Sequence, residues 1–114
     1  MPYIGINTSR QLSDEQREKI KTELGRLITI IPTKTEAATF VDFSEGRTLY
    51  KGGVKIDGAI IELRIWHKSE FEDKKKFVEE AFQLFTRELG LKPENMTMNV
   101  FECDEVGVGG TLKA

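Results

Sequence analysis

Hydrophobic residues recur along the chain in two similar blocks, and each block predicts a strand, a helix and a second strand. The first block opens with an apolar-rich segment over residues 2–8, which predicts a strand. A helix then follows, because apolar residues recur at helical spacing at Ile20, Leu24, Leu27, Ile28 and Ile31. Pro32 ends this helix, and a second strand is predicted over residues 38–43.

The second block repeats this order. A strand is predicted over residues 59–66 and another over residues 96–101. The helix between them ends near Gly90, a residue type that favours helix C-termini, and its apolar face comprises Phe77, Val78, Ala81, Phe82, Phe85 and Leu89. The tail over residues 106–112 reads as a glycine-rich turn with short strand-like flanks.

Each helix is preceded by a capping-box pattern. Ser13 is followed three residues later by Gln16, and Ser69 by Glu72. A right-handed crossover makes the two strands of each half parallel. We therefore predict one α/β domain over residues 1–114. It is a two-layer sandwich of two tandem βαβ units, with a four-stranded sheet and both helices on one face.

The strand over residues 59–66 predicts different chemistry on the two sheet faces. One face is wholly apolar and should meet the helices: Ala59, Ile61, Leu63 and Ile65. The other face carries Ile60, Glu62, Arg64 and Trp66, with Phe101 from the last strand. A cluster of apolar residues on this second face favours self-association. A monomer whose end loops cover the face remains the alternative.

Composition and charge limit the classes of partner and cofactor that the chain is expected to bind. Among 114 residues the net charge is −2 and basic residues are scattered, which argues against nucleic-acid or membrane partners. Cys103 is the single cysteine, so no intrachain disulfide can form and a reducing compartment is expected. We expect a cytoplasmic protein, with export without a signal sequence left open. No cluster of metal-ligand residues is evident, so no metal or other cofactor is expected.

Several short motifs stand in a specific order. Met1 and Pro2 open the chain and are followed by the strand residues Tyr3 to Thr8. Lys34 follows the first helix, and Gly52 and Gly53 precede the third strand. Residues 93–99 and 106–107 complete the series. Over nearly the whole chain this order resembles the tautomerase superfamily, and specifically the macrophage migration inhibitory factor family. The resemblance implies a homotrimer with sites between subunits and an N-terminal proline at the base of each pocket.

The resemblance also implies a function. It implies a keto–enol tautomerase acting on small phenylpyruvate-like α-keto acids, with Pro2 as general base after Met1 is removed. Lys34 would meet the substrate carboxylate, and Trp66, adjoined by Ile65, would offer its backbone N–H. The remaining pocket positions implied are Thr97, Asn99, Val106 and Val108. Two alternatives stay open: a superfamily enzyme acting on another unsaturated keto acid, and a non-catalytic binding or signalling protein.

Pro2 has a physical case as a base. Tautomerisation needs a base that is neutral near pH 7 and close to the carbon acid. A terminal amine has a pKa of about 7.7–8.0, and burial or a nearby cation lowers it. With Met1 attached, however, the Pro2 nitrogen is an amide and is not basic.

The sequence departs from the family pattern in the pocket. Thr97 and Val108 stand where the mammalian cytokine has a tyrosine and a tryptophan, which predicts a weaker hold on an aryl ring. An aromatic wall could instead come from Tyr3, Phe40, Tyr50 or Trp66. Gly58 and Ile61 replace that protein's Cys-x-x-Cys pair, so thiol oxidoreductase activity is not expected.

Overall fold

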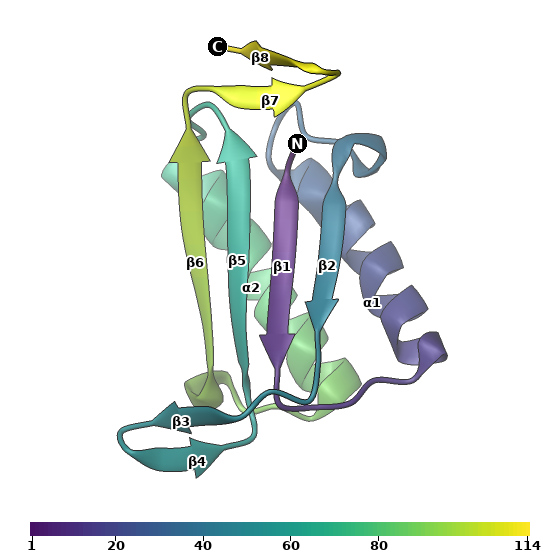
Figure 1. The fold of residues 1–114 in the computed structure, drawn as a ribbon, viewed down its shortest axis with the longest axis vertical. Helices are drawn as coiled ribbons and strands as arrows, with labels where there is room; N and C mark the ends of the chain where they lie inside the picture. The colour runs from purple at the N-terminus through teal and green to yellow at the C-terminus, as the bar shows by residue number, and fades with distance from the viewer.

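A four-stranded sheet covered on one face by two antiparallel helices forms the body of the molecule (Figure 1). We describe it from a computed structural model of residues 1–114. The strand order is β2-β1-β5-β6. The elements of this body are β1 (Tyr3–Thr8), α1 (Asp14–Leu27), β2 (Phe40–Ser44), β5 (Ala59–Trp66), α2 (Phe71–Leu89) and β6 (Met96–Cys103).

The pairing directions confirm the predicted tandem architecture. β1 runs parallel to β2, and β5 runs parallel to β6. The two halves meet through antiparallel pairing of β1 with β5, in which Tyr3 lies opposite Arg64. The start of β1 therefore lies beside the end of β5.

The core lies between the sheet and the helices. Ala59, Ile61, Leu63 and Ile65 are buried on the helix side of β5, as their alternation predicts. The two helices meet them with fully buried side chains that include Ile20, Leu24, Phe77 and Phe85. Neither helix has the length and apolar character that a membrane crossing would require.

The start of α1 confirms the predicted capping box. The Ser13 hydroxyl accepts the Gln16 backbone N–H at 3.1 Å, and the Gln16 side chain accepts the Ser13 backbone N–H at 2.9 Å. After Leu27 the chain tightens into the 3-10 turn η1 (Ile28–Ile30), which ends before Pro32.

The prediction of a capping box at Ser69 is wrong. The helix N-cap is Glu70, and no side chain caps it. The Ser69 backbone N–H instead donates to the Glu102 carboxylate at 2.7 Å, and Lys74 of α2 donates to the same carboxylate at 2.9 Å. A carboxylate from β6 thus fixes the start of this helix, a tertiary contact that no local pattern encodes.

Two further segments differ from expectation. Residues 38–43 were predicted as a strand, but the 3-10 turn η2 (Glu36–Ala38) occupies the start and the strand runs over Phe40–Ser44. The loop around Gly52 and Gly53 is a hairpin of β3 (Leu49–Lys51) and β4 (Val54–Ile56). Both glycines have positive φ, at 60° and 79°, which suits a tight hairpin turn.

The C-terminal tail forms a second hairpin, as predicted. Its strands are β7 (Val106–Val108) and β8 (Thr111–Lys113). Figure 1 shows β7 crossing the end of the sheet at which the N-terminus lies, whereas the β3–β4 hairpin lies at the opposite end. The tail can therefore contribute side chains beside Pro2.

Candidate functional site

A pocket lies on the uncovered side of the sheet at the N-terminus, and we call it the N-terminal pocket. Its volume is about 550 Å³. Val106 and Val108 of the tail hairpin close one side. The other lining residues are Met1, Tyr3, Phe40, Glu62, Arg64, Gly107 and Gly109.

Pro2 is buried at the edge of this pocket. Its carbonyl accepts the Phe40 backbone N–H at 2.9 Å, which fixes it against the start of β2. Extending the β1–β5 register by one residue from Tyr3 and Arg64 places Pro2 beside Ile65. Met1 itself lines the pocket, so loss of Met1 would turn the Pro2 nitrogen into a secondary amine beside it.

Lys34 reaches the same end of the sheet. Its ammonium group donates to the backbone carbonyl of Trp66 at 2.7 Å and is partly buried. Thr33, in a left-handed conformation with φ of 73°, turns the chain toward β5 just before it. An ammonium has three donors, so this bond leaves two for another acceptor. Lys34, Trp66 and Pro2 therefore converge on the end of β5.

The end of β5 is held by the turn that follows β6. The Trp66 indole N–H donates to the Asp104 carbonyl at 3.2 Å, and the His67 ring lies 4.4 Å from the indole. His67 has a φ of 72°, and its backbone N–H donates to Cys103. Because the Ile65 side chain is fully buried in the core, only its backbone faces the site. The left-handed conformation of His67 had no signal in the sequence, since such positions favour glycine.

The polar groups on the wall of the N-terminal pocket are paired with one another. The Tyr3 hydroxyl donates to Asp42 at 2.9 Å, and this hydrogen bond is the main reason that the pKa of Tyr3 is raised, with burial and the Asp42 charge adding to it. Arg64 pairs with Glu62 at 3.1 Å and lies over the Phe101 ring. The Tyr3 hydroxyl is therefore neutral and committed to Asp42.

Thr97 and Asn99 lie away from Pro2 in the single chain. In the sheet Thr97 pairs with Ile60, and Ile60 in turn pairs with Asn7. Asn7 is four residues from Tyr3, a distance of roughly 13 Å along β1. Asn99 is exposed on the uncovered sheet face next to Glu62. Six of the predicted residues thus lie at one end of the sheet. Of these, Val106 and Val108 line the N-terminal pocket, whereas Lys34 and Trp66 line a separate hollow of about 230 Å³ at the same end.

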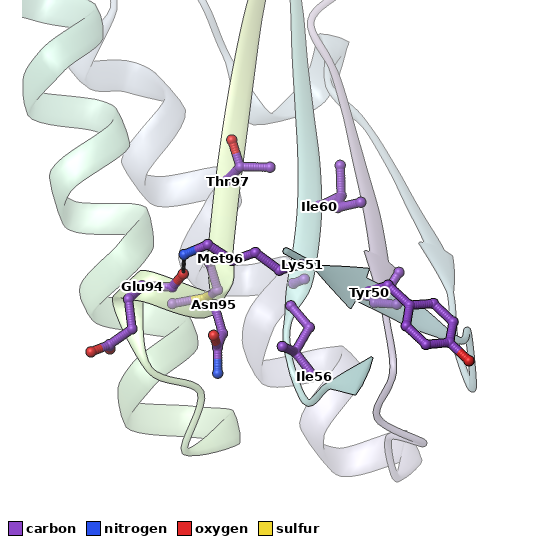
Figure 2. Close-up of a pocket in the computed structure, with 10 residues that line it drawn as sticks. Tyr50, Lys51, Ile56, Ile60, Glu94, Asn95, Met96 and Thr97 are labelled. Carbon is purple, nitrogen blue, oxygen red and sulfur yellow. Dashed lines mark hydrogen bonds between the residues drawn. The ribbon is translucent and has the colours of Figure 1, made fainter. Parts of the chain in front are cut away.

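Thr97 instead lines a second hollow, of about 380 Å³, beside the β3–β4 hairpin. Figure 2 shows Thr97 above Ile60, with Tyr50 lower on the right and the Lys51 ammonium donating to the Glu94 carbonyl on the left, below Thr97. The lining of this hollow includes the Glu94 carboxylate and the Thr97 and Tyr50 hydroxyls, and its one cationic side chain, Lys51, is hydrogen-bonded to the Glu94 carbonyl.

No group of three or more His, Cys, Asp or Glu side chains has the arrangement needed to hold a metal ion. The single thiol, Cys103, donates to the Ile65 carbonyl at 3.4 Å.

Solved structures share this fold over most of the chain. MIF2 from Leishmania major superposes with a TM-score of 0.91 at 19% identity, covering 99% of this chain and 97% of that one. N1, a member of the cis-3-chloroacrylic acid dehalogenase family, gives a TM-score of 0.78 at 19% identity, covering 89% of this chain and 74% of that one. The fused 4-OT protein R7, an asymmetric trimer, gives a TM-score of 0.82 at 12% identity, covering 95% of this chain and 93% of that one.

No family model and no curated protein sequence matches the chain. At these identities the likeness establishes the fold, and it does so independently of the motifs in the sequence. The chain therefore has the fold of the tautomerase superfamily, in the form found in macrophage migration inhibitory factor proteins, as the sequence resemblance predicts.

Proposed function

We propose that the chain, once Met1 is removed, is a cofactor-independent keto–enol tautomerase that acts on α-keto acids, with Pro2 as its general base. One observation carries this proposal: Pro2 is buried beside a pocket at the same end of β5 where the Lys34 ammonium lies 2.7 Å from the Trp66 carbonyl. A base and a carboxylate anchor are thereby combined in one small region.

The proposed reaction is a proton transfer. The neutral Pro2 amine takes a proton from the carbon next to the keto group, and the electron pair of that C–H bond moves to form the enolate. The enolate oxygen gains a proton from water to give the enol, and the hydroxide left behind takes the proton from the Pro2 ammonium, which restores the neutral amine. In the reverse direction the protonated amine returns a proton to carbon. A positioned base of this kind contributes about 10²–10⁴-fold to the rate.

Lys34 has two roles in this proposal. Its unused donors bind the substrate carboxylate, and its charge lowers the pKa of a neighbouring amine, which keeps Pro2 neutral near pH 7. The Trp66 carbonyl holds the ammonium in place before substrate arrives. Pre-positioning reduces the entropy lost when the carboxylate binds.

A second copy of the chain completes the proposed site. Thr97 and Asn99 lie outside the N-terminal pocket of their own chain, so they would reach Pro2 only from a neighbouring subunit. We therefore propose a homotrimer with its sites between subunits. The similar fold of the R7 trimer and the exposed apolar residues on the uncovered sheet face support this arrangement.

A second candidate is chemistry on another unsaturated keto acid. The structural likeness to a member of the cis-3-chloroacrylic acid dehalogenase family favours it, because the same frame carries enzymes of more than one kind. The polar residue Thr97 and the short side chain of Val108 would leave room for a substrate of different shape. A panel of α-keto acids and unsaturated acids separates this candidate from the first.

The proposal is tested by steady-state enolisation of phenylpyruvate with chain lacking Met1. We expect turnover by the unvaried chain and a KM about ten- to a hundredfold higher for Lys34→Ala, because a hydrogen bond to a charged group is lost. Lys92→Ala is the matched control, since Lys92 is an exposed lysine whose ammonium makes no hydrogen bond and which lines neither the N-terminal pocket nor the hollow that holds Lys34. Absence of turnover, or equal effects of the two substitutions, would contradict the proposal.

A further inference from the structure

An apolar groove runs along the side of α2 that borders β6, and we call it the α2 groove. It consists of two hollows, of about 470 and 290 Å³, that share Phe82. The first lies between α2 and β6, and its apolar lining residues are Phe71, Val78, Phe82 and Val100. The second lies between the later turns of α2 and Pro93. None of these residues lines the N-terminal pocket, so the groove is separate from the candidate site.

The groove is long compared with its apolar contacts. Phe71, Val78, Phe82 and Thr86 follow one another at intervals of seven, four and four residues, which places them on one face of the helix. Between Phe71 and Thr86 the helix advances about 22 Å. Val78 and Phe82 are half-buried against the core, whereas Phe71 and Val100 are 69% and 36% exposed. An apolar surface of this length matches an extended acyl chain.

The charges of the first hollow cancel one another. Every charged side chain that lines it belongs to an ion pair: Lys74 with Glu102 at 2.9 Å, and Lys75 with Glu79 at 3.3 Å. This part of the groove therefore offers an apolar surface with no net charge.

The second hollow carries a cation instead. Arg87 is its only charged lining residue. The Arg87 Nε donates to Glu88 at 3.2 Å, but Glu88 also pairs with Lys19 at 3.4 Å, so one carboxylate faces two cations. The terminal N–H groups of Arg87 stay free, and Gln83 and Thr86 beside it add further donors. One end of the groove is thus suited to a carboxylate.

We propose that the α2 groove binds a long-chain fatty acid. Its carboxylate lies on the Arg87 guanidinium, whose planar fork of donors matches a carboxylate. Its acyl chain runs past Phe82 and between Val78 and Val100 toward Phe71, where burial removes it from water. The proposal does not depend on the chemistry of Pro2.

The ligand class is tested by displacement of the fluorescent fatty acid cis-parinarate from the intact chain. We expect palmitate to displace it saturably. Hexadecanol should bind about tenfold more weakly than palmitate, because it lacks the carboxylate that bonds to a charged group. Octanoate should also bind more weakly than palmitate, because it buries fewer CH₂ groups.

Two variants test the place of binding. Val100→Asp should weaken palmitate binding about tenfold or more, because a charge would stand against the acyl chain. Val54→Asp is its control, since Val54 is 65% exposed in the β3–β4 hairpin. Arg87→Gln should weaken palmitate about tenfold and leave hexadecanol unchanged. Arg47→Gln is its control, since Arg47 is exposed and lies outside the groove.

Four results would overturn the proposal. The first is absence of saturable displacement by palmitate. The second is an equal effect of a groove variant and its control, which would indicate unspecific binding. The third is displacement of cis-parinarate by phenylpyruvate, which would place the fatty acid in the N-terminal pocket. The fourth is a lower sedimentation mass for Val100→Asp, which would show that a second copy of the chain covers the groove.

Discussion

Gly58 lies where another part of the backbone passes so closely that no side chain fits. A Cβ atom at this position would come within 2.0 Å of the Asn95 carbonyl oxygen, in the 3-10 turn η3 (Pro93–Asn95). Its own carbonyl accepts the Thr8 hydroxyl at 2.9 Å. This residue joins the start of β5 to the turn before β6 and sets the spacing of these two strands.

We predict that Gly58→Ala lowers the free energy of unfolding by about 1–3 kcal/mol, because the backbone must move to admit the methyl group. Urea denaturation monitored by tryptophan fluorescence measures this change in the free energy of unfolding. Gly107→Ala is the control, since a Cβ at Gly107 meets nothing within 4 Å, and we expect a change within about 0.5 kcal/mol. Equal losses for the two variants would show that the close approach is unimportant.

At the residue scale, the family resemblance implied which residues form the candidate site but not how they are arranged. Pro2, Lys34 and Val106 were named as site residues on that resemblance alone. The bond from Lys34 to the Trp66 carbonyl depends on a left-handed turn at Thr33 that the sequence does not signal. The separation of Thr97 from Pro2 follows from strand register, which is a property of the folded sheet.

At the element scale, the start of α2 depends on a carboxylate from β6. Glu102 accepts the Ser69 backbone N–H at 2.7 Å and the Lys74 ammonium at 2.9 Å. The Lys74 ion pair and the Ser69 hydrogen bond hold the pKa of Glu102 below its usual value. The contact ties the end of the sheet to the helix that follows β5, next to the candidate site.

We predict that Glu102→Gln lowers the free energy of unfolding by about 1 kcal/mol or less near neutral pH. A carboxyl with a lowered pKa in the folded state adds stability above its unfolded pKa of about 4.3 and loses it as pH falls through the folded value. The difference between the two proteins should therefore vanish in acid. Urea denaturation at pH 7 and pH 3 measures it.

Glu105→Gln serves as the control for this measurement, because Glu105 makes no hydrogen bond or ion pair in the structure. We expect it to leave stability unchanged at both pH values. A Glu102→Gln effect that persists unchanged in acid would show that the carboxylate charge is not what stabilises the start of α2.

The elements that the sequence predicted well are those that depend on local patterns. The alternation along β5 and the capping box at Ser13 are local, and both were correct. The capping box at Ser69 was wrong, because Glu102 from a distant strand takes the Ser69 N–H. The β3–β4 hairpin was missed because its two strands have three residues each and expose most of their surface.

At the scale of the whole molecule, one sheet face has no cover. The helices lie on the other face, and Figure 1 shows β1, β5 and β6 open toward the viewer. Ile60 and Phe101 on this face are 39% and 43% exposed, and the charged pair of Glu62 and Arg64 lies on the same face. A partly apolar open face of this kind is typical of an interface between subunits.

We predict a homotrimer at micromolar concentration. Sedimentation equilibrium should give the mass of three chains, and Ile60→Lys should shift the population toward smaller species by placing a charge in the interface. Lys55→Gln, at an exposed position in the β3–β4 hairpin, is a control expected to leave the mass unchanged. A single-chain mass for the unvaried protein would contradict the proposal of sites between subunits.

The central claim is that a free Pro2 amine performs the chemistry, and one paired measurement tests it most directly. Phenylpyruvate tautomerisation is measured with two samples verified by intact mass, one lacking Met1 and one retaining it. We expect activity only in the sample that lacks Met1, and this activity should rise with pH as the amine loses its proton. Pro2→Gly keeps a terminal amine, so we expect it to have reduced but measurable activity. Full activity in the sample that verifiably retains Met1 would contradict it.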